Sequence, residues 1–127
     1  MKEQQRIPRR KVKLPSKKLE AMFTQQARFQ NLFYDFKRMN KPDKDHYLQL
    51  MLQCIHVETV EALNWLNWKP WKKQQQPWNR YEFLNELIDI QHFLINCALA
   101  CQCDSEEFTK LFLNKGKENL DRQQRGY

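Results

Sequence analysis

The chain has 127 residues, of which 41% are hydrophobic and 29% charged, and its formal net charge is +7. This length predicts one domain with a modest core. Glycine occurs only twice, which argues against sandwich, barrel and doubly wound sheet folds. No apolar run reaches the roughly 20 residues that span a bilayer, and no apolar stretch follows the basic N-terminus as it would in a secretory signal. We therefore expect an all-α, cytoplasmic protein with no membrane partner.

The basic charge is concentrated at the N-terminus. Residues 1–18 contain eight lysines and arginines and one glutamate, whereas residues 19–127 contain equal numbers of basic and acidic side chains. We expect residues 1–18 to form a flexible basic arm and residues 19–127 to form the folded domain. Such an arm could touch nucleic acid, a membrane surface or an acidic partner. A solvated tail is the simpler expectation, so nucleic-acid contact is not expected.

Apolar periodicity and punctuation predict four helices after the arm, over residues 17–38, 43–67, 79–102 and from 104 to 115 or beyond. The segment between the second and third helices contains Pro70 and Pro77, which break the helical pattern. Asn79 followed by Glu82, and Asp104 followed by Glu107, resemble N-caps with a reciprocal acid. This pattern predicts an antiparallel helical bundle of four to five helices.

Two pairs of carboxylates lie on or beside the apolar stripes of the second and third predicted helices: Glu58 on the stripe with Glu61 beside it, and Glu86 with Asp89 at the stripe's edge. Consecutive helices joined by a short break pack antiparallel, which would bring the two pairs face to face. Four converging carboxylates repel one another and lose hydration, so they need a compensating charge. Ligands that are all oxygen suit hard cations, Mg²⁺ first and Mn²⁺ as an alternative. If the acids instead face solvent or pair with lysine and arginine, no metal is needed.

The C-terminal segment carries the opposite charge. Lys115, Asn119 and Arg122 share one face if this segment is helical. Arginine as a bidentate fork and lysine as a point charge suit a polyphosphate, and Lys72, in the loop between the acid pairs, could add to them. The alternative is a solvated, charged tail.

Amides interrupt the apolar stripe of the first predicted helix at Gln26 and Gln30. A primary amide can read both a donor and an acceptor on the edge of a base, and the rings of Trp65, Trp68, Trp71 and Phe93 could stack on that base. The alternative is that the amides hydrogen-bond within the core and that the tryptophans are packing residues.

These motifs together resemble the all-α nucleoside triphosphate pyrophosphohydrolases, and within them the dimeric dUTPases. The resemblance rests on the E-x-x-E pair at Glu58 and Glu61, the tryptophan- and lysine-rich loop, and the E-x-x-D pair at Glu86 and Asp89 that continues to His92 and Phe93. The segment from Lys115 to Gln123 resembles the ending typical of that family. Residues 19–127 are covered, and the basic arm is not. Phe29 and Gln30 stand where the family has leucine followed by asparagine or aspartate.

The resemblance implies hydrolysis of a deoxynucleoside triphosphate, dUTP foremost, to the monophosphate and pyrophosphate. It implies that Glu58, Glu61, Glu86 and Asp89 hold Mg²⁺, that Glu58 or Glu61 takes the proton of the attacking water, and that dimerisation completes the bundle. The pyrophosphohydrolase alternatives are dCTP and non-standard nucleotides as substrates. An alternative of a different class is a basic helical module that binds nucleic acid without catalysis.

Overall fold

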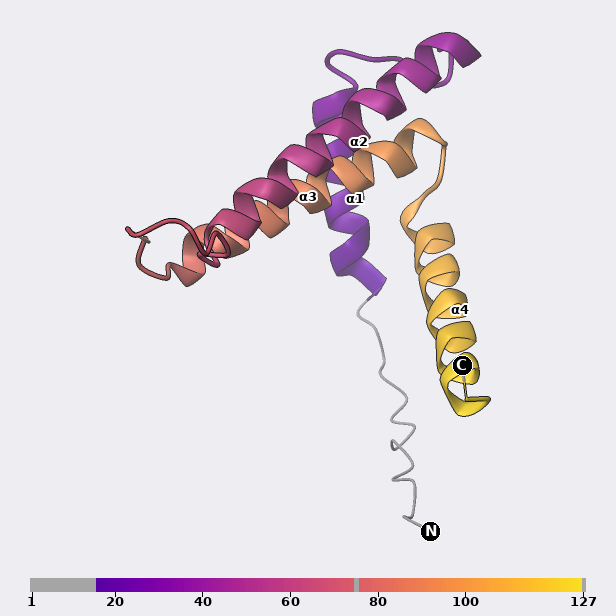
Figure 1. The fold of residues 1–127 in the computed structure, drawn as a ribbon. Coiled ribbons are helices and arrows are strands. Elements are labelled where there is room, and N and C mark those ends of the chain that lie inside the picture. Colours follow the sequence, from indigo (N-terminus) through magenta and orange to yellow (C-terminus); the bar gives the residue numbers. More distant parts are fainter. Residues whose placement is uncertain (1–15, 75, 127) are drawn as a thin grey trace.

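The computed structural model describes residues 16–74 and 76–126. These residues form four helices and no strand: α1 (Ser16–Gln30), α2 (Lys41–Asn64), α3 (Arg80–Ala100) and α4 (Ser105–Gln124) (Figure 1). The all-α class and the number of helices are therefore confirmed. The expected arm, residues 1–18, lies outside the described residues except for residues 16–18, which begin α1.

Side-chain caps begin three of the helices. Asn40, Asn79 and Asp104 each accept a hydrogen bond from the backbone N–H three residues further on, which satisfies a donor that the helix itself leaves unpaired. The caps predicted at Asn79 and Asp104 are therefore confirmed. Because each cap is a local interaction between neighbouring residues, the sequence alone places these helix starts correctly.

The first helix ends earlier than the sequence pattern predicts. We expected it to continue to residue 38, but α1 ends at Gln30 and two turns follow before α2. The turns let the chain bend back, so that Phe36 is buried and its ring lies 5.0 Å from the ring of Tyr47 on α2. Burial of Phe36 in the core of α2 and α3 therefore overrides the local helical pattern.

The second helix ends at Asn64, three residues before the predicted end. Asn67 has a φ of 51°, in the left-handed region, where the helix cannot continue. The loop that follows is held closed by side chains: Asn67 Nδ2 donates to the Gln76 carbonyl at 2.8 Å, and Gln76 Nε2 donates to the Asn64 carbonyl at 2.9 Å. This loop joins α2 to α3 and holds the tryptophans and lysines of the predicted phosphate and base contacts.

Helices α2 and α3 run antiparallel along most of their length, and α1 crosses them (Figure 1). The core lies where these helices meet and contains Phe36, Tyr47, Met51 and Ala100. Helix α4 projects away from the α2–α3 pair (Figure 1) and packs on α1, where the rings of Phe108 and Phe23 are 5.5 Å apart. No residue of α4 is buried. Among the described residues, no helix has both the length and the apolar character needed to cross a membrane.

Candidate active site

The antiparallel α2–α3 pair brings three of the four predicted acids together. One carboxylate oxygen from each of Glu58, Glu86 and Asp89 lies within 4.8 Å of the other two. We call these three residues the acid cluster. Glu86 and Asp89 are one turn apart on α3 and so share a face, which α2 covers with Glu58. Of the two acid pairs that we expected to face each other, the structure brings Glu58 to Glu86 and Asp89.

The environment of Glu58 disfavours its charge. Among the described residues, its Oε2 is the only buried side-chain oxygen or nitrogen that has no hydrogen-bond partner. Desolvation by burial is the main cause that raises the pKa of Glu58 to about 7, and the neighbouring Glu86, Glu61 and Asp89 carboxylates raise it further. A buried acceptor among like charges calls for a bound cation or a proton.

Glu61 stands at the margin of this group. Its side chain is exposed, and it is not among the three residues whose oxygens lie within 4.8 Å of one another. It is nevertheless close enough to Glu58 to raise the pKa of that carboxyl. The four acids therefore do not form a symmetric quartet: three converge tightly, and Glu61 lies beside them, nearer to solvent.

The donor set fits a hard divalent cation. All ligand atoms of the acid cluster are carboxylate oxygens, the type that Mg²⁺ and Mn²⁺ prefer. His92, one turn after Asp89, has its Nδ1 3.9 Å from an Asp89 oxygen. The sequence analysis did not identify His92 as a site residue. Its i,i+3 spacing from Asp89 could have indicated that it lies beside the acid cluster.

The two amides of α1 are both buried, with 7% of Gln26 and 6% of Gln30 exposed. Gln26 Nε2 donates to Asn96 Oδ1 of α3 at 2.9 Å, and Gln30 Oε1 accepts from the Tyr47 hydroxyl of α2 at 2.8 Å. Both amides therefore hydrogen-bond within the core, which the sequence analysis gave as the alternative to contact with a base. The sequence analysis did not identify Asn96, which lies seven residues after Asp89 on α3. An amide within an apolar stretch was the sequence feature that could have identified it.

The loop between α2 and α3 holds a small cavity. Its volume is about 270 Å³, and it is lined by Asn64, Asn67, Trp68, Lys69, Lys72 and Gln76. Lys72 therefore faces a space that an anion could enter. Trp71 is 70% exposed and packs edge-on against Trp68, with ring centroids 5.8 Å apart. Its ring offers area for stacking, and it lies on the loop rather than beside the two amides of α1.

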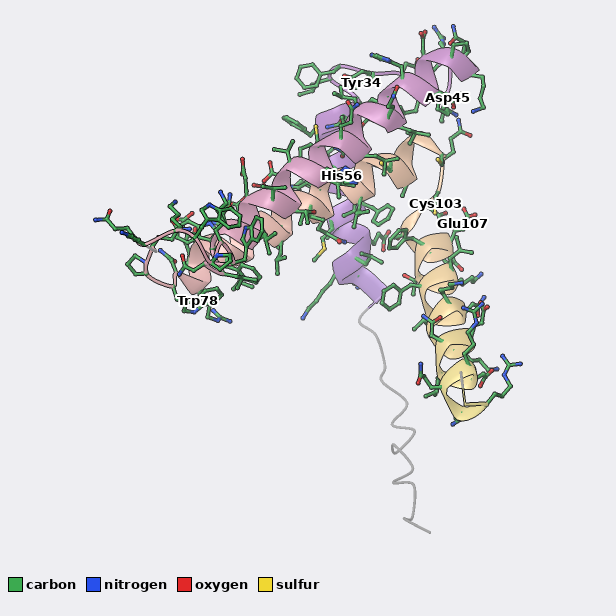
Figure 2. All side chains as sticks on the ribbon, in the orientation of Figure 1. Tyr34, Asp45, His56, Trp78, Cys103 and Glu107 are labelled. Carbon is green, nitrogen blue, oxygen red and sulfur yellow. The ribbon has the colours of Figure 1, made fainter. Side chains whose placement is uncertain are left out.

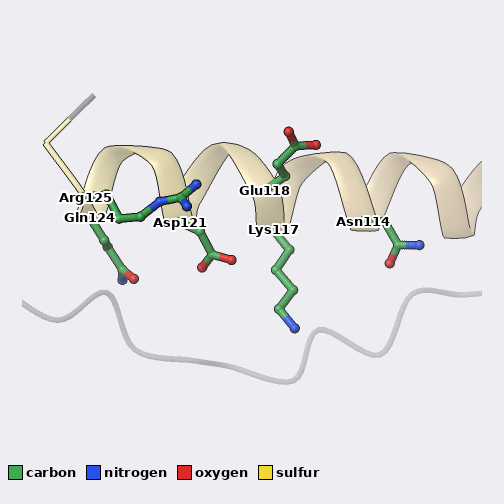
Figure 3. A pocket seen from close by; sticks show the side chains of 6 residues that line it. All are labelled: Asn114, Lys117, Glu118, Asp121, Gln124 and Arg125. Carbon is green, nitrogen blue, oxygen red and sulfur yellow. The ribbon is translucent and has the colours of Figure 1, made fainter.

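The predicted phosphate contacts of the C-terminal segment lie on α4, and we call Lys115, Asn119 and Arg122 the cationic face of α4. Glu118 pairs with both cations, at 3.5 Å from Lys115 Nζ and 2.6 Å from Arg122 Nη2. Figure 3 shows the neighbouring open hollow of α4, which is lined by Asn114, Lys117, Glu118, Asp121, Gln124 and Arg125. Since α4 packs on α1 and projects away from α2 and α3 (Figures 1 and 2), one chain does not bring this face to the acid cluster.

Similarity to known proteins identifies the family of this chain. The family model for dUTPase matches residues 18–117, which is more than half of the chain and contains all four predicted acids. A dCTP pyrophosphatase of Enterobacteria phage T4 is 37% identical over 54 residues, which cover 42% of this chain and 32% of that protein. No solved structure is significantly similar. Asn119 and Arg122 lie beyond the residues that the family model matches. The chain belongs to the dUTPase family.

Proposed function

We propose that this protein hydrolyses a deoxynucleoside triphosphate, dUTP foremost, to the monophosphate and pyrophosphate with the help of Mg²⁺. The observation that supports this most strongly is the acid cluster, in which three carboxylates from two helices converge and one oxygen of Glu58 is buried without a partner. A triphosphate cannot approach such a cluster unless a cation lies between them, because both carry negative charge. Membership of the dUTPase family supports the same substrate class.

In this proposal Glu58, Glu86 and Asp89 hold the cation, and Glu61 completes the set from the exposed side. When bound, a divalent cation neutralises phosphate charge, orients the phosphates and makes a water molecule more acidic. In this proposal Glu61 takes the proton of the attacking water at its carboxylate; its exposure and its proximity to Glu58 support this role. Glu58 is the other candidate for this proton.

The phosphates also need cationic contacts from the protein. Lys72 faces the loop cavity, and Lys115 and Arg122, with the Asn119 amide, offer donors along α4. Such donors stabilise charge that develops on the phosphates during in-line attack. We propose that these four residues bind the phosphate groups and that Gln26 and Gln30 read the edge of the base. Trp71 lies on the loop, away from these amides, so in this proposal it stacks on the base bound by a second copy of the chain.

A homodimer is part of the proposal. Large apolar side chains are exposed on α2 and α4, among them Leu52, Val57 and Val60 on α2, and Leu111, Phe112, Leu113 and Leu120 on α4. Exposed apolar surface of this extent is typical of a face that another protein covers. A second copy of this chain would cover it and would bring a second α4 into reach of the α2–α3 pair.

The direct test is a panel of deoxynucleoside triphosphates assayed for pyrophosphate release with Mg²⁺, with Mn²⁺ and with EDTA. We expect dUTP to be hydrolysed fastest and EDTA to abolish turnover. A preference for dCTP would support the second candidate substrate, which is favoured by the similarity to the phage T4 dCTP pyrophosphatase. Equal rates for purine triphosphates would contradict the pyrimidine assignment. Salt-sensitive binding of single-stranded DNA without any hydrolysis would support the non-catalytic alternative instead.

A further inference from the structure

A chain of buried polar side chains connects α1 to α2 and α3. Gln26 donates to Asn96 at 2.9 Å, Asn96 Nδ2 points to the Met51 sulfur at 3.6 Å, and the Tyr47 hydroxyl donates to Gln30 at 2.8 Å. Asn96 is 3% exposed and Tyr47 is buried to the same degree. Buried polar groups restrict the packing around them to arrangements that satisfy their hydrogen bonds.

These partners use only one polar group of each glutamine. The NH₂ group of Gln26 is occupied, which leaves its carbonyl oxygen, and the carbonyl of Gln30 is occupied, which leaves its NH₂ group. Within the described part of the chain, neither remaining group is among the buried atoms that lack a partner, so neither is sealed from solvent. The two glutamines are four residues apart on α1, so their side chains lie on one face.

The donors and acceptors in this chain have fixed directions. Burial raises the pKa of Tyr47 well above its usual range, and the neighbouring Tyr34 and Cys97 raise it further, so the hydroxyl keeps its proton and donates. Asn96 turns its NH₂ group to the Met51 sulfur, a weak acceptor, and its carbonyl to Gln26. Rotating the Gln26 amide by half a turn would place its carbonyl against the carbonyl of Asn96. Rotating the Gln30 amide would take away the acceptor of the buried Tyr47 O–H.

We propose that Asn96 and Tyr47 are positioning residues that fix the two glutamine amides, so that Gln26 presents an acceptor and Gln30 a donor to the edge of a pyrimidine base. This proposal rests on the proposed function, in which these glutamines contact the base. Uracil carries a donor at N3 beside an acceptor at O4, and cytosine carries an acceptor at N3 beside a donor at N4. Fixed amides therefore favour one pyrimidine and reject the other, whereas amides that rotate accept both.

The position of Asn96 along α3 agrees with this role. It lies seven residues after Asp89, and a rise of about 1.5 Å per residue separates their Cα atoms by roughly 10 Å along the helix. This separation is comparable with the distance from the base to the α-phosphate of a nucleotide. Gln26, which Asn96 holds, can therefore contact the base while the acid cluster lies near the phosphates.

The test replaces Tyr47 with phenylalanine, which removes only the hydroxyl. We expect the ratio of kcat/KM between dUTP and dCTP to fall about 5-fold, the effect of one lost hydrogen bond, through KM rather than kcat. Tyr34→Phe is the matched control, because its ring packs against Tyr47 at a centroid distance of 4.7 Å and no role is assigned to its hydroxyl. It should leave the ratio unchanged.

A double-mutant cycle separates positioning from a structural effect. If Tyr47 acts through Gln30, Tyr47→Phe should not change the ratio further in a Gln30→Met background. An unchanged ratio in Tyr47→Phe, or an equal change in both backgrounds, would overturn the proposal. If these variants are too unstable to assay, a second measurement is the binding of dUMP and of dCMP to the metal-free Asn96→Ser protein by calorimetry. The inference requires that the affinities for the two nucleotides differ less in this variant than in wild type. Absence of hydrolysis in the wild-type protein would instead contradict the proposed function.

Discussion

The acid cluster and the cationic face of α4 differ in how firmly the single chain holds them. The acid cluster is formed by two packed helices and includes a buried oxygen of Glu58, so it is in place before any ligand binds. The cationic face lies on a helix with no buried residue, and its lysine and arginine are both paired with Glu118. The difference indicates that the proposed metal site is preformed in the fold, whereas the proposed phosphate site requires α4 to gain a further contact, from the nucleotide or from a second copy.

The largest effect is expected from the acid cluster. Glu58→Gln removes one charged ligand and keeps the shape of the side chain, so we expect kcat/KM to fall at least about 100-fold, because the cation loses a ligand that orients the reaction. Glu61→Gln should also reduce turnover strongly if Glu61 takes the proton. Steady-state pyrophosphate release and calorimetry with Mg²⁺ measure both effects.

Glu82→Gln is the matched control for these variants, because Glu82 lies in the first turn of α3, one turn before Glu86, and is not one of the three residues of the acid cluster. It should retain near-normal activity and metal binding. A fully active Glu58→Gln protein, or an equal loss in Glu82→Gln, would remove the acid cluster from the mechanism.

A smaller effect is expected from the cationic face. Arg122→Ala should lower kcat/KM by about 10-fold to 100-fold, because a charge-assisted contact to phosphate is lost, without weakening Mg²⁺ binding in the absence of nucleotide. Arg125→Ala is the comparison, since Arg125 lies at the C-terminal cap of α4, outside the predicted face. If both variants behaved as wild type, α4 would have no part in phosphate binding. The cationic face could then not be compared with the acid cluster as a second part of the site.

Metal removal should change stability rather than only activity. The pKa of Glu58 is raised to about 7 from an ordinary value of 4.5, so the folded, metal-free protein binds a proton more tightly than the unfolded chain does. Its stability should therefore fall as the pH rises from about 4.5 to 7, because folding then requires a crowded, ionised carboxylate. Thermal melts in EDTA across this range should show Tm decreasing toward neutral pH.

Added Mg²⁺ should reverse this trend, because it stabilises the ionised cluster. Glu58→Gln should raise the Tm of the metal-free protein at pH 7, since the repulsion with Glu86, Glu61 and Asp89 is relieved. A metal-free Tm that increases from pH 5 to 7 in the wild type and not in the variant would contradict the electrostatic description of the acid cluster.

The smallest effect is expected from the N-terminus. Deleting residues 1–15 should leave turnover on dUTP within a few-fold of wild type, because none of the four predicted site acids and no residue of the cationic face belongs to that segment. Enzyme assays together with size-exclusion chromatography check this expectation. A collapse of turnover with fold and oligomeric state retained would show that the segment takes part in the site.

The sequence by itself determined those features that depend on neighbouring residues. The caps at Asn79 and Asp104, the number of helices and the spacing of the two acid pairs are local patterns, and two consecutive helices with a short connection have few ways to pack. These features were sufficient to place Glu58 opposite Glu86 and Asp89. The dUTPase family followed from the same motifs.

Where long-range contacts compete with local preference, only the tertiary structure decided the helix ends and the side-chain partners. Burial of Phe36 against Tyr47 ends α1 at Gln30, although the local pattern favours a longer helix. The packing of α2 on α3 separates Glu61 from the acid cluster, and the partners of the two glutamines, Asn96 and Tyr47, are 70 and 17 residues away in sequence. Such contacts depend on how whole helices cross, because a small rotation of one helix changes every side chain on the shared face, and no local pattern fixes that rotation.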